Sequence, residues 1–313
     1  MWRYLVVVLL LLLLTLGCTC RPKVPAPLTP QEKRVVVVYH PAYLTVYGDE
    51  LAAQPGRIEA ILKELQGVPG FIFTEPEPAS VEDIRRVHTQ RQIDSVKSKG
   101  NELYNIALLS AGGAVLAAEV AVAGEVSMAI NRPPGHHASA NNSANYCYFN
   151  NIAVAVGKLL DEKKIQRALI VDIDLHFGDG TADIFRNDSR VTYYYLPEVG
   201  KVLLEPPPGE SSVETNLDYV YRPEEDRIPQ LQALEEYLKK TTGYDILAVS
   251  AGFDRGREDW GRIFEVEDYR TIGRLLKEAA ERNCQGKRFA VLEGGYNHEV
   301  LGKNVKAFLE GFQ

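Results

Sequence analysis

Residues 167–180 read RALIVDIDLHFGDG, an apolar run that ends in acids, a histidine and a glycine-rich turn. A short, continuous apolar run bounded by a turn is typical of a strand that is covered on both faces of a parallel sheet. Similar strands followed by polar residues occur at Val126–Asn131, Asp245–Ala251 and Arg288–Leu292. Ligands bind at the carboxyl ends of strands in such sheets, so these polar residues predict a functional site there.

Amphipathic segments alternate with the apolar runs along the chain. Further strands are expected at Val35–His40 and Val191–Leu196. Helices are expected at Arg57–Gln66, Val81–Val96 with a break near His88, Leu103–Val122, Asn151–Glu162, Leu231–Lys240, Val266–Arg282 and Glu299–Glu310. This alternation predicts one α/β domain with a mainly parallel sheet and helices on both of its faces.

Acidic residues and a histidine gather at the ends of two of these strands. Asp172 and Asp174 are expected on one face of a strand, and His176 continues the alternation. Asp254 follows a second strand in the motif SAGFD. Carboxylates and imidazole suit a divalent metal such as zinc, and three protein ligands leave a position open for water. The alternative is that these acids cap helices or turns, but acids without a cation would repel one another.

Two adjacent histidines and a tyrosine follow other strand ends. His136 and His137 lie in RPPGHHASANN, and the chain has six histidines in all. A carboxylate behind an imidazole fixes its tautomer, so this pair could transfer protons. Tyr296 lies in EGGYN, where a phenol could stabilise an oxyanion. Most tyrosines after glycine only pack, so its position after a strand is what favours this role.

The motifs RPPGHHA, YCYFNN, DIDLHFGDG, SAGFD and EGGYN occur in this order along the chain. Together they resemble the zinc-dependent histone deacetylase and acetylpolyamine amidohydrolase superfamily, with a likeness that extends from Tyr39 to Asn297. The resemblance implies the arginase/deacetylase fold, a three-layer α/β/α sandwich. It also implies removal of acetyl groups from an acetylated amine, such as an acetylpolyamine or an acetyl-lysine peptide, by metal-activated water.

The resemblance assigns a ligand set and a substrate tunnel. It implies that Asp174, His176 and Asp254 bind zinc, and that a structural potassium ion can bind near the DIDLH segment, partly through backbone oxygens. Tyr146 matches an aromatic wall of the acyl-lysine tunnel. The second wall stays unassigned, because VTYYYLPEVGK lacks the family pattern in that segment.

The resemblance also assigns the proton-transfer residues. Asp172 would lie behind His136, and Asp179 would lie behind His137. It implies that His137 is the general base, that His136 gives electrostatic or acid assistance, and that Tyr296 stabilises the oxyanion.

Two features depart from the family pattern, and two other functions are alternatives. Asn145 stands where the family usually has glycine, and asparagine tolerates the left-handed backbone conformation. The short loop around Lys97–Glu102 has no clear counterpart of the acidic residue that holds the substrate backbone in many family members. An arginase-like ureohydrolase is an alternative, but it would need a second acid where this chain has Gly256. A non-catalytic, lipid-anchored binding protein on the same fold is another.

The N-terminus reads MWRYLVVVLLLLLLTLGCTC. Its apolar run has about a dozen residues, which is short for a membrane span and typical of a signal peptide. Gly17-Cys18 resembles the bacterial lipoprotein cleavage site. We therefore expect a signal peptide at 1–17, lipid on Cys18, a proline-containing tether at 18–33 and the deacetylase domain at 34–313. The protein would be exported and anchored in a bacterial cell envelope. The alternative is an uncleaved signal anchor.

The charge and the cysteine spacing argue against a nucleic-acid partner and against a cysteine-based zinc site. The formal net charge is −7 and no basic patch stands out, so a nucleic-acid partner is not expected. The four cysteines have no zinc-knuckle spacing. Cys147 lies between aromatic residues, which predicts a buried free thiol.

Overall fold

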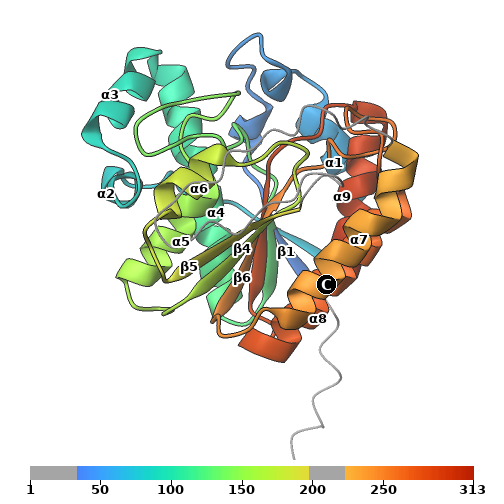
Figure 1. Ribbon diagram of the computed structural model, residues 1–313. Helices are drawn as coiled ribbons and strands as arrows, with labels where there is room; N and C mark the ends of the chain where they lie inside the picture. The colour runs from blue at the N-terminus through green and yellow to red at the C-terminus, as the bar shows by residue number, and fades with distance from the viewer. Residues whose placement is uncertain (1–33, 197–222) are drawn as a thin grey trace, which may run out of the picture. The chain divides into compact units, whose positions relative to one another are not determined.

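A seven-stranded sheet, parallel throughout, forms the centre of the part of the chain that the computed structural model describes, residues 34–196 and 223–313 (Figure 1). The strand order is β2-β1-β3-β7-β6-β4-β5. The strands are β1 Val35–Val38, β2 Phe71–Thr74, β3 Val126–Ala129, β4 Ala168–Asp172, β5 Val191–Tyr195, β6 Ile246–Ala251 and β7 Arg288–Leu292. The predicted α/β sandwich around a parallel sheet is confirmed.

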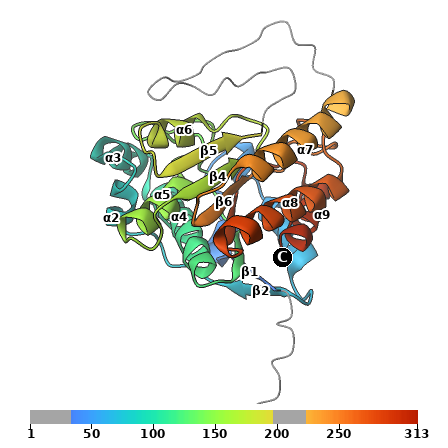
Figure 2. The same ribbon diagram turned by 60° about the horizontal axis from the view of Figure 1, so that its bottom comes forward.

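Helices cover both faces of this sheet (Figure 2). One face is covered by α1 Arg57–Leu65, α7 Pro223–Lys240, α8 Val266–Cys284 and α9 His298–Phe312. The other face carries α4 Asn101–Val122, α5 Asn151–Asp161 and α6 Asp179–Phe185, with α2 Val81–Arg85 and α3 Gln90–Ser98 packed outside them. Side chains alternate between the two cores, so Val35 and Val37 pack on one face while Val36 and Val38 pack on the other.

The helix α4 is apolar because it lies inside the fold. Its length and mean hydropathy of 1.7 would suit a membrane span, yet 67% of its most apolar window is buried in the domain. Gly112 allows a close approach, since a Cβ there would lie 1.9 Å from the carbonyl oxygen of Glu77. The pair Gly112-Gly113 lies inside this helix, which continues through it as the sequence predicted. The absence of a side chain at Gly112 allows the close packing.

The structure corrects several element predictions. The strand β2 was not predicted, because its sequence FIFT is short and only partly buried. The turn expected after DIDLHF continues into α6. The helix expected at Val81–Val96 is two helices, α2 and α3, and the break falls at His88. The helix α7 is longer than predicted and includes Pro229.

The prediction that Asp172 and Asp174 share one strand face is wrong. The strand β4 ends at Asp172, whose Oδ1 accepts a hydrogen bond from the backbone N–H of Asp174 at 3.0 Å. This local turn replaces the strand, so Asp174 and His176 are placed by the loop after β4 and not by β alternation.

Some expectations concern parts of the chain outside the described residues. These are the signal peptide at 1–17, the lipidation site Cys18, the tether at 18–33 and the part of VTYYYLPEVGK that follows Leu196.

Candidate active site

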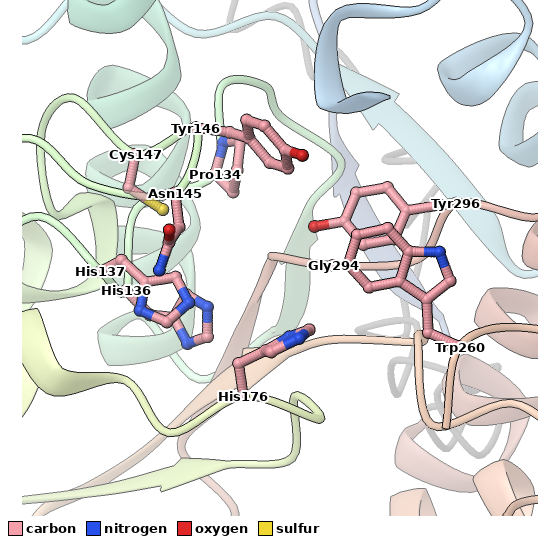
Figure 3. Close-up of a pocket in the computed structure, with 10 residues that line it drawn as sticks. All are labelled: Pro134, His136, His137, Asn145, Tyr146, Cys147, His176, Trp260, Gly294 and Tyr296. Carbon is pink, nitrogen blue, oxygen red and sulfur yellow. The ribbon is translucent and has the colours of Figure 1, made fainter. Parts of the chain in front are cut away.

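A cavity of about 210 Å³ opens at the carboxyl ends of the central strands (Figure 3). Its walls come from the loops after β3, β4, β6 and β7, four of the neighbouring strands in the sheet. The lining residues are Pro134, His136, His137, Asn145, Tyr146, Cys147, His176, Trp260, Gly294 and Tyr296. The polar residues singled out in the sequence therefore meet at one place, as expected for a parallel sheet.

Three potential metal ligands converge beside this cavity, and one of them, His176, lines it. The Nδ1 atom of His176 lies 3.2 Å from Asp174 Oδ1 and 3.0 Å from Asp254 Oδ2. One ligand atom from each residue lies within 4.8 Å of the others. Both aspartates are buried, while His176 is partly exposed to the cavity. Two carboxylates and an imidazole at this separation form a donor set that suits a divalent cation.

The hydrogen bonds around these carboxylates leave one oxygen for a cation. Asp174 Oδ2 accepts from the N–H of Gly294 at 2.8 Å, and Asp254 Oδ1 accepts from the N–H of Leu175 at 2.9 Å. Asp254 Oδ2 is buried and lies 3.0 Å from His176 Nδ1, but within residues 34–196 and 223–313 it accepts no hydrogen bond. A buried carboxylate oxygen that accepts no hydrogen bond is costly, and a metal ion between it and the imidazole would satisfy it.

The pKa shifts of these residues also favour a cation at this place. The hydrogen bond to Asp174 and the neighbouring Asp254 carboxylate raise the pKa of His176 to about 10. Burial and the charge of Asp174 raise the pKa of Asp254. The cluster thus carries excess negative charge, which a bound cation would offset.

Each of the adjacent histidines has a carboxylate behind it. His136 Nδ1 lies 3.0 Å from Asp172 Oδ2, and His137 Nδ1 lies 2.6 Å from Asp179 Oδ1. The two rings are 4.1 Å apart. Burial alone would lower the pKa of His136, but the Asp174 and Asp172 carboxylates outweigh it and hold that pKa well above its usual value.

Tyr296 faces the histidines from the opposite wall, and its hydroxyl points into the cavity (Figure 3). Burial and the charges of Asp174 and Asp254 raise the pKa of its phenol far above the usual value, so the group stays protonated. Its backbone N–H donates to Asp259 Oδ2 at 2.7 Å, which ties the loop after β7 to the loop after β6. A rigidly held, protonated phenol is suited to donate a hydrogen bond to a developing oxyanion.

Two aromatic side chains flank the mouth of the cavity. The Tyr146 ring lies 6.3 Å from the Tyr296 ring. Asn145 has a φ of 44°, so asparagine keeps the left-handed turn where the family usually has glycine. On the other side, Trp260 packs at 4.5 Å against Tyr296 and at 5.7 Å from the His176 ring. Trp260 therefore lines the cavity together with Tyr146.

Sequence reasoning missed Trp260, Asp259 and Glu293. Trp260 follows the SAGFD motif by six residues and is 46% exposed, and an exposed tryptophan near a strand end was the available signal. Glu293 precedes the GGY motif, and its Oε2 accepts from the N–H groups of Gly135 at 2.7 Å and His136 at 3.1 Å. It thereby fixes the loop that carries the histidine pair.

A second group of potential ligands lies beneath the first. His136, Cys147 and Glu293 are buried and close enough to share an ion. Glu293 already accepts three hydrogen bonds, including one from Ser250 Oγ at 3.2 Å. Burial raises the pKa of Cys147 well above its usual value, so the thiol is neutral. These groups are satisfied within the protein, and the prediction of a buried free thiol at Cys147 is confirmed.

Comparison with known proteins agrees with these features. The histone deacetylase domain family matches residues 51–312. A probable deacetylase from Methanothermobacter thermautotrophicus is 31% identical over 308 residues, which cover 88% of this chain and 90% of that protein. A histone deacetylase-like amidohydrolase from Pseudomonas aeruginosa is 29% identical, covering 77% of this chain and 71% of its own. The crystal structure of the HDA15 HD domain is 26% identical, with a TM-score of 0.73 over 90% of this chain and 89% of that one. The chain belongs to the histone deacetylase family.

Proposed function

We propose that this protein is a zinc-dependent deacetylase that hydrolyses the acetamide of an acetylated amine. The observation that carries the proposal is the convergence of three ligand atoms, from Asp174, His176 and Asp254, opposite the Tyr296 hydroxyl and beside two carboxylate-backed histidines. This constellation unites a metal site, a proton-transfer pair and an oxyanion donor in one cavity.

The metal site would be formed by Asp174, His176 and Asp254. Zinc held there would act as a Lewis acid on the amide carbonyl and acidify a water molecule. The Oδ2 of Asp254 and the Nδ1 of His176, which lie 3.0 Å apart, are the atoms best placed to bind it. The metal ligands come from two loops. The backbone N–H groups of Leu175 and Gly294 donate to the two carboxylates and would hold them in place before metal binds.

His137 is the proposed general base. Its Nδ1–H donates to Asp179, which leaves Nε2 as the proton acceptor. His137 would take a proton from the attacking water and pass it to the amine nitrogen as the C–N bond breaks. The C–O bond to the water oxygen forms and the C–N bond breaks, which gives acetic acid and a neutral amine; the acid then loses the second water proton, and the released amine takes one up.

His136 and Tyr296 would stabilise charge during this reaction. The high pKa of His136, caused by Asp174 and Asp172 against the effect of burial, favours an imidazolium beside the developing negative charge. Tyr296 remains a neutral phenol and would donate its proton in a hydrogen bond to the former carbonyl oxygen.

The substrate is proposed to be a small acetylated amine or an acetyl-lysine peptide. The aromatic walls Tyr146 and Trp260 would contact the aliphatic part next to the acetamide. The net charge of −7 gives no support to a nucleic-acid partner.

The test is hydrolysis by the purified full-length protein of a panel of acetylated polyamines, acetyl-lysine peptides and other small acetamides. We expect acetate release that is lost on chelation and restored by zinc. A zinc-loaded protein that hydrolyses none of them would favour the non-catalytic binding protein. Urea release from a guanidino substrate with manganese would favour the ureohydrolase, although Gly256 offers no second acid for that metal pair.

We also propose that the protein is exported and attached to a bacterial envelope membrane through lipid on Cys18. The support is the short apolar run that ends at Gly17-Cys18 and the proline-containing segment up to Lys33. Mass spectrometry of the mature N-terminus would distinguish a lipidated Cys18 from an uncleaved Met1.

A further inference from the structure

A fully buried arginine lies directly behind the metal-ligand loops. Arg255 follows Asp254 in the chain and is 0% exposed. Its Nε donates to the carbonyl oxygens of Asp174 at 3.0 Å and Ile173 at 3.2 Å. One terminal nitrogen donates to the carbonyl oxygen of Leu196 at 2.6 Å, and the other to Gln230 Oε1 at 2.7 Å. The guanidinium thus joins the loops after β4, β5 and β6 to α7.

The four oxygen atoms that accept these hydrogen bonds are neutral. Three are backbone carbonyls and one is a side-chain amide, and the Tyr195 ring lies 5.3 Å from the guanidinium carbon. Converging carbonyl oxygens are the ligands that a monovalent cation such as potassium takes in proteins. Here the side chain itself brings the positive charge to them.

A potassium ion does not fit this cluster. The carbonyl oxygens of Ile173 and Asp174 accept from Arg255, and the next one, of Leu175, accepts from the Tyr195 hydroxyl at 2.5 Å. The resemblance allowed for potassium near DIDLH, partly through backbone oxygens, but three successive carbonyls of that segment are already bonded to side chains.

We propose that Arg255 is a built-in cation that takes the place of a monovalent metal ion at this cluster and positions the metal ligands. The proposal rests on the metal site of the proposed function. Arg255 holds the backbone of Asp174 through its carbonyl, and it neighbours Asp254 in the chain. Because both carboxylates are buried, a positive charge behind them also offsets part of their mutual repulsion.

The first experiment removes the guanidinium with Arg255→Ala in the full-length protein. Outer groups that orient metal ligands typically change affinity by about 10- to 100-fold, so zinc affinity should fall by that factor in competition with a chromogenic chelator. The freed carbonyls should then accept potassium. The unfolding temperature of the metal-free protein should be measured in potassium and in tetramethylammonium, each at about 0.1 M so that screening is equal. The rise in unfolding temperature in potassium should be larger for the variant than for the wild type.

The matched control is Arg288→Ala. Arg288 is 4% exposed, donates to the carbonyl oxygens of Phe312 and Gly286 at 2.7 Å each, and lies 5.3 Å from the Phe312 ring. It stands at the start of β7, at the opposite end of the sheet from the cavity. This variant should lose stability while its zinc affinity and its response to potassium stay as in the wild type.

If Arg255→Ala does not fold, Arg255→Lys gives the test. Its ammonium keeps the charge but lacks the planar fork, so zinc affinity should fall less than about tenfold and potassium should add no stability beyond its wild-type effect. A potassium response in Arg255→Lys larger than that of the wild type would contradict the proposal. So would wild-type zinc affinity, or a wild-type potassium response, in Arg255→Ala. These readouts need no turnover, so failure to find a deacetylase substrate would leave them decisive.

Discussion

Replacing Tyr296 by phenylalanine isolates the role of one hydroxyl. Within residues 34–196 and 223–313 no hydrogen bond from this hydroxyl is found, so its removal breaks no internal contact. The ring contacts are kept, because Trp260 packs on the ring at 4.5 Å and the Arg57 guanidinium lies 5.6 Å from its centre. The variant should therefore fold and bind zinc as the wild type does.

The expected loss lies in turnover. Removing one oxyanion donor typically lowers kcat by about 100- to 1000-fold, or about 2.7–4 kcal/mol at about 1.36 kcal/mol per tenfold. Since burial and the carboxylates hold the pKa of Tyr296 far above its usual value, the phenol should stay protonated and impose no alkaline limb on the wild-type rate. Steady-state acetate release by zinc-loaded protein between about pH 6 and pH 10 measures both effects.

Tyr146→Phe is the matched control, because it removes a hydroxyl from the facing ring 6.3 Å away. It should change kcat by no more than a few-fold, since its proposed role uses the ring face. A zinc-loaded Tyr296→Phe enzyme whose kcat stays within about tenfold of the wild type would refute the oxyanion role. Equal losses in both variants would mean that the measurement reports disturbed packing.

Four further outcomes are expected. Asp254→Asn should remove a negative charge and one carboxylate oxygen from the ligand set and abolish both stoichiometric zinc and turnover; metal analysis that finds full zinc would contradict the ligand assignment. Zinc affinity of the wild type should fall as pH falls, by up to about tenfold per unit, because protons compete for His176, whose pKa is about 10 without metal; a chelator titration across pH checks the slope. His137→Ala should lower kcat by at least about 100-fold with zinc retained, which single-turnover acetate release measures. Cys18→Ala should leave an unprocessed, unlipidated precursor, seen as an intact Met1 by mass spectrometry.

The sequence predicted the fold well where burial is uniform. The strands β4, β6 and β7 are buried along their whole length, and their continuous apolar runs identified them. The strand β2 was missed because an edge strand with exposed Ile72 has no such run. Local signals in a single chain report burial, so a four-residue edge strand such as β2 depends on pairing with a partner that is distant in sequence.

The sequence predicted those residues of the site that lie directly after the ends of strands. Histidine and acid motifs after strands had to meet at one edge of a parallel sheet, and they do. The reason given for Asp174 was wrong, because a turn after Asp172 and not strand alternation places it. Residues such as Trp260 and Arg255 could not be found in this way, because their importance depends on contacts between loops that no short motif encodes.

Buried charges hold these loops by pairing with backbone groups from other loops. The Glu293 carboxylate accepts from the N–H of His136, the Asp259 carboxylate accepts from the N–H of Tyr296, and the Arg255 guanidinium donates to the carbonyl of Asp174. Each bond joins segments that are far apart in sequence, and each ends on the backbone of a residue that faces the cavity or the metal site. A reaction that develops charge gains most from dipoles and ligands fixed beforehand. Glu293, Asp259 and Arg255 therefore contribute to the geometry of the site as much as the side chains that would touch the substrate.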